Sequence, residues 1–473
     1  MMTPSQEFRL WARQAPNRQR VPAAIAGLAL LGLLVWAFIP ITSTGSAASA
    51  SSAEGTRVAV SKTPPSPAAK PAKCTDPTGT VPGITPDAIR VGVIIVNITG
   101  LATNASLGVL PAATQKAGFQ AVIDAINADG GVDCRQLVPQ YFNANPADQS
   151  NLQKTCLDIV QSGVFATVDA GAYAQFPIVD CFGQHQVPYF GGYLLANSQM
   201  AQFYPYLFEL NSQDVVYHDM VVGLQEYGFF KPESGFTKLG YIYNDCHPEI
   251  HTEVVKWLAD AGVTPAQTVG FDTGCTTAFT PATVLLQAIL KFKHAGVTNL
   301  ITTGIVGDFP TFTQLAEVQK FRPKYGLGDD SLITTSYGTH RPDAKNIDGA
   351  IAITPSRNGE ERTPNVTPTA ETQKCSTLIG QDVYKLPDAA GNICDQLWMF
   401  AAAVTHAPTL ARASLADGLK AAQSVQFSFP QGPNDFAAGS QVTYAGQYWR
   451  TTQFHASCAC FQLVNQTFQP TPP

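Results

Sequence analysis

Residues 89–171 alternate between strand and helix patterns, and this alternation restricts the possible fold more than any other feature of the 473-residue chain. The segment opens with IRVGVIIV, a run apolar enough for a strand that is buried on both faces of a parallel sheet. Residues 115–131 then place apolar side chains at helical spacing and end in two glycines. A second strand, a helix over residues 148–160 and a third strand over residues 164–172 follow. The resulting βαβαβ order predicts a parallel sheet covered by helices, with right-handed crossovers.

The same stretch resembles the start of the type I periplasmic binding proteins, in the group of ABC-transporter receptors that bind leucine, isoleucine or valine. The resemblance rests on the helix ending I-N-x-x-G-G, at Ile126, Asn127, Gly130 and Gly131, and on the order of the elements around it. Similar segments continue downstream, so the resemblance covers roughly residues 86–464. It implies an α/β fold of two lobes, each a parallel sheet covered by helices, which three crossings of the chain join as a hinge.

The domain boundaries follow from the composition and from this resemblance. Residues 1–41 place four arginines before an uncharged run over residues 23–39, which predicts a signal or a membrane anchor. Because the arginines stay on the cytoplasmic side, the rest of the chain is expected outside the cytoplasm, either held by this N-terminal helix or secreted after cleavage. The further predicted parts are a disordered linker rich in Ser, Ala and Pro over 42–85, lobe 1 over 86–211 and 347–422, and lobe 2 over 212–346 and 423–466.

The net charge and the number of cysteines limit the kinds of binding partner and the cellular compartment that are expected. The net charge of −6 argues against nucleic acid as a partner. In an exported chain the ten cysteines favour disulfides. The pairs that join neighbouring predicted elements are Cys246 with Cys275 and Cys375 with Cys394. Cys458 and Cys460 are separated by one residue, so they bond either to each other or to distant partners.

No nucleophile elbow, zinc-protease motif, phosphate loop or dinucleotide fingerprint occurs, which favours a binding protein without cofactor over an enzyme. The densest polar cluster is residues 245–251, where His247 and His251 are four residues apart and Asp245 and Glu249 supply carboxylates. A zinc site and a metal-dependent hydrolase are one reading of this cluster. The other is a strand-to-helix loop with an ordinary helix cap, and it predicts no metal.

The loops that follow the predicted strands are the expected ligand contacts, because ligands bind at the carboxyl ends of strands in open α/β sheets. Where the family places Ser or Thr around an amino-acid ligand, the loops here carry Tyr173 and Tyr193, whose rings suit a flat or apolar ligand. The predicted ligand-binding residues are Asn97, Thr99, Ala172, Tyr173, Gly192, Tyr193, Asp245, His247, Glu249, Thr303, Gly304 and Tyr337.

The resemblance implies a solute-binding protein that closes around a small ligand and presents it to an ABC permease. The expected ligand is an amino acid, an amide or a related organic solute. The first cysteine, Cys74, lies far from the apolar run, so a lipid-modified cysteine is not expected there and the membrane is reached through the N-terminal helix. A membrane-anchored sensory ectodomain with the same fold is the alternative function.

Overall fold

The computed structural model describes most of the chain beyond residue 73. The described residues are 74–75, 77, 79–97, 109–146, 148–169, 178–191, 195–244, 246–275, 280–304, 308–328, 341–383, 391–428, 434–436 and 441–472. Within them, no helix combines the length and the apolar character that crossing a membrane requires. The predicted N-terminal helix lies outside these residues.

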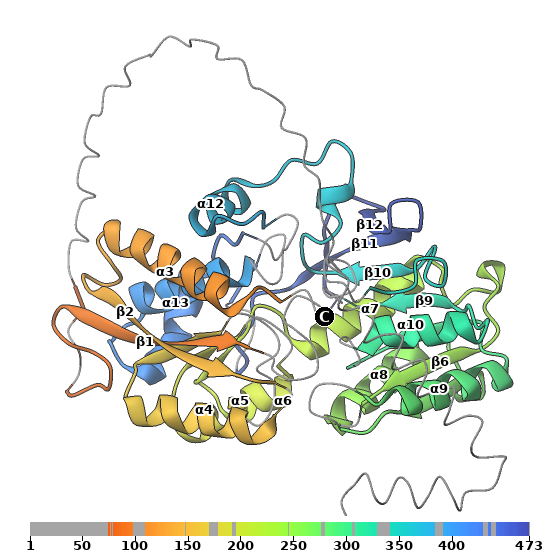
Figure 1. Cartoon of the computed structure of the whole chain (residues 1–473), viewed down its shortest axis with the longest axis horizontal. Helices are drawn as coiled ribbons and strands as arrows, with labels where there is room; N and C mark the ends of the chain where they lie inside the picture. Colours follow the sequence, from red (N-terminus) through yellow and green to blue (C-terminus); the bar gives the residue numbers. More distant parts are fainter. Residues whose placement is uncertain are drawn as a thin grey trace, which may run out of the picture. The chain divides into compact units, whose positions relative to one another are not determined.

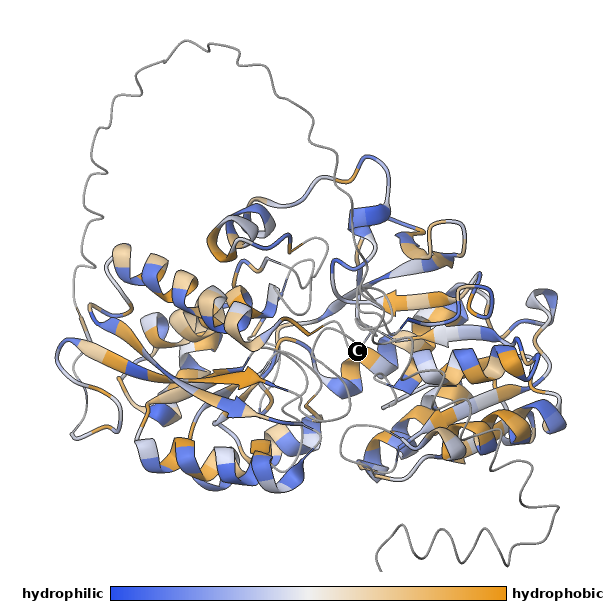
Figure 2. Cartoon of the chain, in the orientation of Figure 1, coloured by the Kyte–Doolittle hydropathy of each residue, from blue (hydrophilic) through white to orange (hydrophobic). Residues whose placement is uncertain are grey.

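Lobe 1 is built on a parallel sheet of five strands in the order β2-β1-β3-β4-β5. Its strands are β1 (Ala88–Val96), β2 (Gln136–Ala144), β3 (Ala166–Asp169), β4 (Tyr189–Phe190) and β5 (Leu207–Phe208). The apolar run predicted as a doubly buried strand is β1, an interior strand, with Val91 paired to Pro139 on one side and Ala166 on the other. Hydrophobic residues follow one another along β1, whereas the covering helices alternate in hydropathy (Figure 2).

Helices cover both faces of this sheet. One face is covered by α3 (Ala112–Ala128) and α13 (Asn392–His406), which lie together in Figure 1, with α12 (Ala370–Ile379) and α14 (Leu415–Ala422) beside them. Phe119 and Phe400 are fully buried in this layer. The other face is covered by α4 (Gln149–Ser162) and α5 (Ile178–Gln184). Lobe 1 also contains the short α6 (Asn197–Gln202).

Lobe 2 contains a larger, mixed sheet in the order β12-β11-β10-β9-β8-β6-β7. The first five of its strands along the chain are parallel: β6 (Leu239–Tyr243), β7 (Thr268–Asp272), β8 (Asn299–Thr302), β9 (Lys324–Leu327) and β10 (Ile351–Thr354). The chain then adds β11 (Tyr448–His455), antiparallel to β10 and to β12 (Cys460–Leu463), and β13 (Gln469–Pro470) pairs with β11. The predicted strand over residues 331–338 lies outside the described residues.

Two pairs of helices cover the lobe 2 sheet. On one face α7 (Gln213–Glu226) and α8 (Pro248–Asp260) bury Met220 and Val254. On the other face α9 (Ala282–Ala295) and α10 (Phe309–Val318) bury Ile289 and Phe312. Short 3₁₀ turns complete the described secondary structure at Pro232–Ser234, Pro265–Gln267, Glu360–Arg362 and Arg412–Ser414. The predicted α/β fold, with a helix-covered parallel sheet in each lobe, is confirmed.

Three crossings join the lobes, at residues 209–212, 355–369 and 446–447. The first crossing runs beside the third and beside the segment that leads into it, because the Gly446 N–H donates to the Leu210 carbonyl at 2.9 Å and the Glu209 N–H donates to the Thr443 carbonyl at 2.8 Å. The second crossing is tied to β11, which follows directly after the third crossing, by a buried ion pair between Glu360 and Arg450, at 2.7 Å.

The structure moves three of the predicted domain boundaries. Strand β10 pairs with β9 and β11, so the start of the predicted lobe 1 segment 347–422 belongs to lobe 2. Conversely, Phe427 and Phe436 pack in the lobe 1 core although they fall in the predicted lobe 2 segment 423–466. The end of the predicted linker 42–85 is also part of lobe 1, because the Arg90 N–H donates to the Gly83 carbonyl at 2.8 Å.

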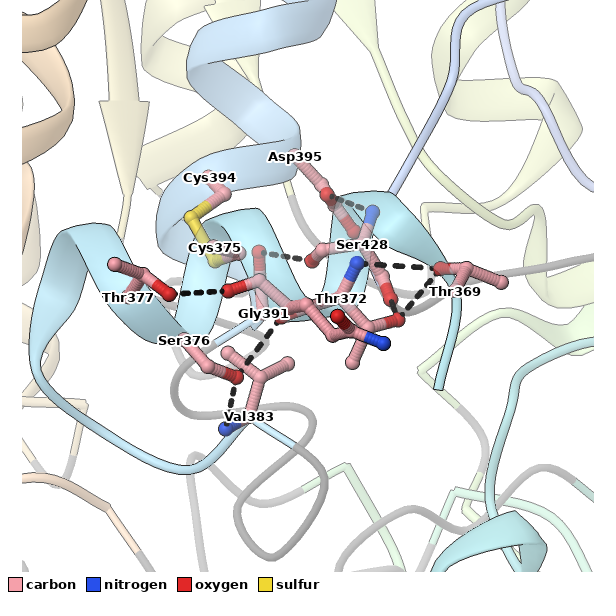
Figure 3. The surroundings of a disulfide bond; sticks show 11 residues. Thr369, Thr372, Cys375, Ser376, Thr377, Val383, Gly391, Cys394, Asp395 and Ser428 are labelled. Atoms are coloured by element: carbon pink, nitrogen blue, oxygen red, sulfur yellow. Dashed lines mark hydrogen bonds between the residues drawn. A yellow bond between two sulfur atoms is a disulfide. The ribbon is translucent and has the colours of Figure 1, made fainter. Parts of the chain in front are cut away.

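Five disulfides link the ten cysteines: Cys74–Cys134, Cys156–Cys181, Cys246–Cys275, Cys375–Cys394 and Cys458–Cys460. They include both pairs that the sequence favoured. Figure 3 shows the bond between Cys375 of α12 and Cys394 of α13. Beside it the Asp395 carboxylate accepts a hydrogen bond of 2.6 Å from the Ser428 N–H, which brings the segment after α14 onto the same pair of helices.

Candidate functional site

The strand order of each sheet identifies where a ligand is expected. Going outward from β1, the chain first adds β2 on one side and then β3 to β5 on the other, and β6 is flanked in the same way by β7 and β8. The order therefore reverses between β1 and β3 and between β6 and β8. In open α/β sheets, ligands bind at such switch points, outside the carboxyl ends of the strands.

A small pocket lies at the switch point of lobe 2. It is lined by residues from β6, α7, α8 and the loops after β6 and β8: Gln213, Tyr217, Tyr241, Asn244, His247, Ile250, His251, Thr303 and Gly304. Its cavity volume of about 10 Å³ is roughly the space that one water molecule occupies. The pocket therefore has room for one small polar group of a ligand rather than for a whole ligand.

Hydrogen bonds fix the two strand ends that form this pocket. The Gly304 N–H donates to the Tyr217 Oη at 2.8 Å, and the Asn244 Nδ2 donates to the Gly304 carbonyl at 2.8 Å. The Tyr241 and Thr303 hydroxyls lie 3.1 Å apart. Gly304 has φ +77°, and a Cβ there would lie 2.3 Å from the Asn244 Nδ2, so this position requires glycine. Helix α7 thus holds the loop after β8 in one arrangement.

Aromatic rings form the base of the pocket. The His251 imidazole stacks on Tyr243 with ring centroids 3.9 Å apart, and it is nearly parallel to Tyr241 at 5.4 Å. Burial raises the pKa of the Tyr241 phenol well above its ordinary value, so this hydroxyl stays protonated at neutral pH. The stacked rings therefore pack closely at the pocket, and its Tyr241 hydroxyl is uncharged.

Two buried polar atoms at this pocket have no hydrogen-bond partner among the described residues. They are the Oε1 of Gln213, a side chain that is 8% exposed, and the Nδ1 of His251. A buried polar atom without a partner costs about 1–3 kcal/mol, and such atoms are usually satisfied by water or ligand. Both residues line the pocket, so a hydrogen-bonding group placed there could recover part of this free energy.

A hydrogen bond joins the lobes next to the pocket. The Ser198 hydroxyl of α6 donates to the Glu249 carboxylate of α8 at 2.5 Å, and the His247 Nδ1 lies 3.3 Å from the same oxygen. Burial raises the pKa of Glu249, but the hydrogen bonds from Ser198 and its own backbone outweigh this effect, so the pKa is lowered overall. Glu249 is therefore ionised at neutral pH and is occupied by this contact between the lobes.

The corresponding edge of lobe 1 carries a buried polar cluster. Asp169, the last residue of β3, accepts hydrogen bonds from the Tyr189 hydroxyl and, at 3.2 Å, from the Gln396 Nε2. The Gln396 Oε1 accepts from the Asp169 N–H at 2.8 Å. Desolvation by burial, together with the Asp169 charge, raises the pKa of Tyr189 well above its ordinary value. This network fixes the end of β3 beside the lobe 1 switch point.

The structure describes five of the twelve predicted ligand-binding residues. His247, Thr303 and Gly304 come together around the lobe 2 pocket. Glu249 lies beside it, and Asn97 follows β1 with its N–H donating to the Ala144 carbonyl at 2.8 Å. The other seven lie outside the described residues: Thr99, Ala172, Tyr173, Gly192, Tyr193, Asp245 and Tyr337.

The predicted ligand-binding residues do not include six that line this pocket: Gln213, Tyr217, Tyr241, Asn244, Ile250 and His251. Tyr241 lies inside a strand, and the two α7 residues precede Gly304 by about 90 positions, so no local pattern connects them. The one available signal was the pair of polar side chains, Gln213 and Tyr217, one helical turn apart at the start of α7.

The alternative reading of residues 245–251 as a zinc site receives no support from the described part of this segment. Cys246 is bonded to Cys275, which removes its thiolate as a ligand. In the described part of the chain, no three His, Cys, Asp or Glu side chains group together in a way that could hold a metal. Asp245 lies outside that part.

The chain forms two helix-covered sheets joined by three crossings, and each sheet has a switch point at the carboxyl ends of its strands. These features define the class of two-lobed ligand-binding proteins. A family model described as "Periplasmic binding protein" matches residues 89–454, and the chain therefore belongs to the periplasmic binding protein family. This is a family of binding proteins rather than enzymes, and membership implies a location outside the cytoplasm.

Solved structures share the fold at low identity. A substrate-binding protein of an ABC transporter from Desulfitobacterium hafniense, in complex with Leu, is 15% identical with a TM-score of 0.55, covering 80% of this chain and 100% of its own. LivJ from Streptococcus pneumoniae, in complex with isoleucine, is 14% identical with a TM-score of 0.56, covering 82% and 100%. A solute-binding protein from Rhodopseudomonas palustris BisB5, in complex with 3,4-dihydroxybenzoic acid, is 13% identical with a TM-score of 0.57, covering 82% and 98%. A comparison with curated proteins found no match.

Proposed function

We propose that this protein captures a small organic solute between its two lobes and presents it to an ABC permease in the membrane. The single observation that carries the proposal is the pocket at the switch point of lobe 2, where polar groups from β6, α7, α8 and the loop after β8 converge. Ligand that contacts both lobes stabilises the closed arrangement, which a permease can distinguish from the open one.

The chemistry of the pocket favours a ligand with a small hydrogen-bonding group that enters lobe 2. The described residues that line the pocket include no carboxylate, and they offer two side-chain amides, hydroxyl groups and two imidazoles. The Gln213 Oε1 and the His251 Nδ1 are the buried atoms that lack a hydrogen-bond partner among the described residues. A hydroxyl, amide or carboxylic acid group of an amino acid or an aromatic acid has the required size.

For lobe 1 we retain Tyr173 and Tyr193 as proposed ligand contacts, with Asp245 as a proposed polar contact from lobe 2. Two tyrosine rings would supply apolar contact area to a flat or branched ligand. The proteins of similar fold bind Leu, isoleucine and 3,4-dihydroxybenzoic acid. These three compounds, with amides and further aromatic acids, form the panel to be tested first.

The test is a thermal-shift screen of the protein against this panel, followed by calorimetry with the best ligand. A ligand at 100 times its Kd is expected to add about 2.7 kcal/mol to the free energy of unfolding. Tyr217→Phe removes the acceptor of the Gly304 N–H and is expected to weaken binding by about 1 kcal/mol, or about fivefold.

The matched control is Gln225→Ala, an exposed position of the same helix, which is expected to bind like the parent protein. Equal affinities for the parent, Tyr217→Phe and Gln213→Ala would show that the ligand does not use this pocket. A protein that binds no member of a broad panel would count against solute capture itself.

We further propose that the N-terminal segment holds the protein at the outer face of the membrane, or is cleaved and releases it. Four arginines followed by an uncharged run support this proposal. The mass of the mature protein separates the two outcomes.

A further inference from the structure

The hairpin of β11 and β12 is closed at its tip by the disulfide between Cys458 and Cys460, which have a single residue between them. Cys458 is exposed to solvent, whereas Cys460 begins β12 and is 7% exposed. The two sulfur atoms of the bond therefore differ in how easily a reagent in solution reaches them.

This bond differs from the other four disulfides in the length of chain that it closes. The sequence separations of the others are 60, 25, 29 and 19 residues, against 2 for this one. Stabilisation by a disulfide grows with the length of the loop that it closes, because a longer loop loses more conformational entropy in the unfolded chain. The Cys458–Cys460 bond therefore contributes least to holding the fold together.

The residue inside the small ring has an unfavourable backbone conformation. Ala459 has φ +49°, in the left-handed region that residues with a Cβ rarely occupy. Opening the disulfide would release Ala459 from this constraint. Strained or exposed disulfides are more easily reduced than buried, relaxed ones.

The hairpin has other interactions that remain when the disulfide opens. His455 pairs with Cys460 through the backbone, and Phe461 is fully buried in the core of lobe 2. The Ala456 N–H also donates to the Asp348 carboxylate at 2.8 Å. Reduction is therefore expected to leave β11 and β12 in place.

We propose that Cys458–Cys460 is a thiol–disulfide exchange site that reacts with low-molecular-weight thiols outside the cytoplasm. A thiolate RS⁻ attacks the exposed Cys458 Sγ, the bond between the two protein sulfurs breaks, and Cys460 leaves as a thiolate. Cys458 then carries the mixed disulfide. Attack by Cys460 restores the original bond and releases RS⁻, whereas attack by a second thiol gives RSSR and two protein thiols, a reduction by two electrons.

The first experiment exposes the full-length folded protein to increasing dithiothreitol, alkylates free thiols and maps the modified cysteines. Cys458 and Cys460 are expected to become alkylated at a thiol concentration at least about tenfold below that needed for Cys375 and Cys394. Near-UV circular dichroism is expected to stay native at that point. Alkylation of Cys458 and Cys460 only together with the other pairs, or after them, would overturn the proposal.

Two variants test which sulfur atom reacts, with glutathione disulfide as the probe. Cys460→Ser is expected to form a glutathione adduct on Cys458, at a rate at least about tenfold above that of the adduct on Cys460 in Cys458→Ser. Equal rates, or faster reaction at Cys460, would overturn the assignment of Cys458 as the attacked atom. Ala459→Gly relieves the backbone constraint and is expected to make the disulfide harder to reduce; an easier reduction would contradict the role of Ala459.

Discussion

Asp219 shows how burial alone changes the behaviour of one side chain. It lies in α7, is 1% exposed, and accepts a hydrogen bond of 2.9 Å from the Thr471 hydroxyl through Oδ2. Its Oδ1 has no partner among the described residues. Burial raises the pKa of Asp219 to about 8, and the hydrogen bond from Thr471 offsets only part of this effect. At neutral pH the carboxyl group is therefore mostly protonated.

The raised pKa predicts a stability that falls as the pH rises. The pKa in the folded state, about 8, lies above the ordinary value of 3.8, so the folded state holds a proton that the unfolded state releases. The stabilisation is complete below the ordinary pKa of 3.8 and is lost as the pH rises through the folded-state pKa of about 8. Asp219→Asn is expected to remove this dependence. The free energy of unfolding of the variant is therefore expected to rise, relative to that of the parent, by about 1 kcal/mol per pH unit between pH 5 and 8.

Urea unfolding at several pH values in this range measures the effect. The control is Asp417→Asn in α14, where the carboxylate is exposed and parallel curves for variant and parent are expected. If the stability of Asp219→Asn and that of the parent instead changed with pH in parallel, Asp219 would already be ionised in the folded protein.

At the scale of elements, disulfides hold helices that the sheet by itself does not fix. Cys375 joins α12 to α13, and the Thr372 hydroxyl and N–H bond to Ser428 and Thr369 in the same region (Figure 3). Helix α12 packs on α3 at the margin of the lobe 1 core. Its position therefore depends on this bond as well as on burial.

The double variant Cys375→Ala/Cys394→Ala is expected to lower the free energy of unfolding by about 3 kcal/mol, since the bond closes a loop of 19 residues. The double variant Cys458→Ala/Cys460→Ala serves as the comparison and is expected to lose much less, because its loop is far shorter. Denaturant unfolding of both variants under oxidising conditions measures the difference. Similar losses would mean that loop length does not control the stabilisation in this protein.

At the scale of the whole molecule, buried charge holds the second crossing between the lobes against β11. Arg450 is 2% exposed, pairs with Glu360 at 2.7 Å, and donates from Nη2 to the Ser356 carbonyl at 3.2 Å. The Phe468 ring covers its guanidinium, with 4.2 Å from Cζ to the ring centroid. Glu360 also pairs with Arg357 at 3.0 Å. The second crossing is thereby fixed to β11, the strand that follows directly after the third crossing.

Arg450→Met is expected to destabilise the protein by roughly 3–5 kcal/mol, because it leaves the buried Glu360 with one partner fewer. The double variant Arg450→Met/Glu360→Leu is expected to recover part of this loss, since no uncompensated carboxylate remains. Arg322→Met, which removes an exposed ion pair with Glu317, is the control and is expected to have a small effect. Thermal unfolding compares all four proteins. A double variant less stable than Arg450→Met would contradict this explanation.

The local pattern of apolar residues, glycines and cysteines determined the helices, most strands, the α/β class and the two favoured disulfides. These features depend on neighbours in the sequence: β1 is apolar throughout except at Arg90, and Cys375 and Cys394 lie on consecutive helices. Tertiary structure decided that β10 joins lobe 2 and that Phe427 packs in lobe 1, since strand pairing and core contacts connect distant segments. It also decided the pocket, where Tyr217 of α7 holds the backbone at Gly304, because only the folded chain brings helix and loop within hydrogen-bond distance.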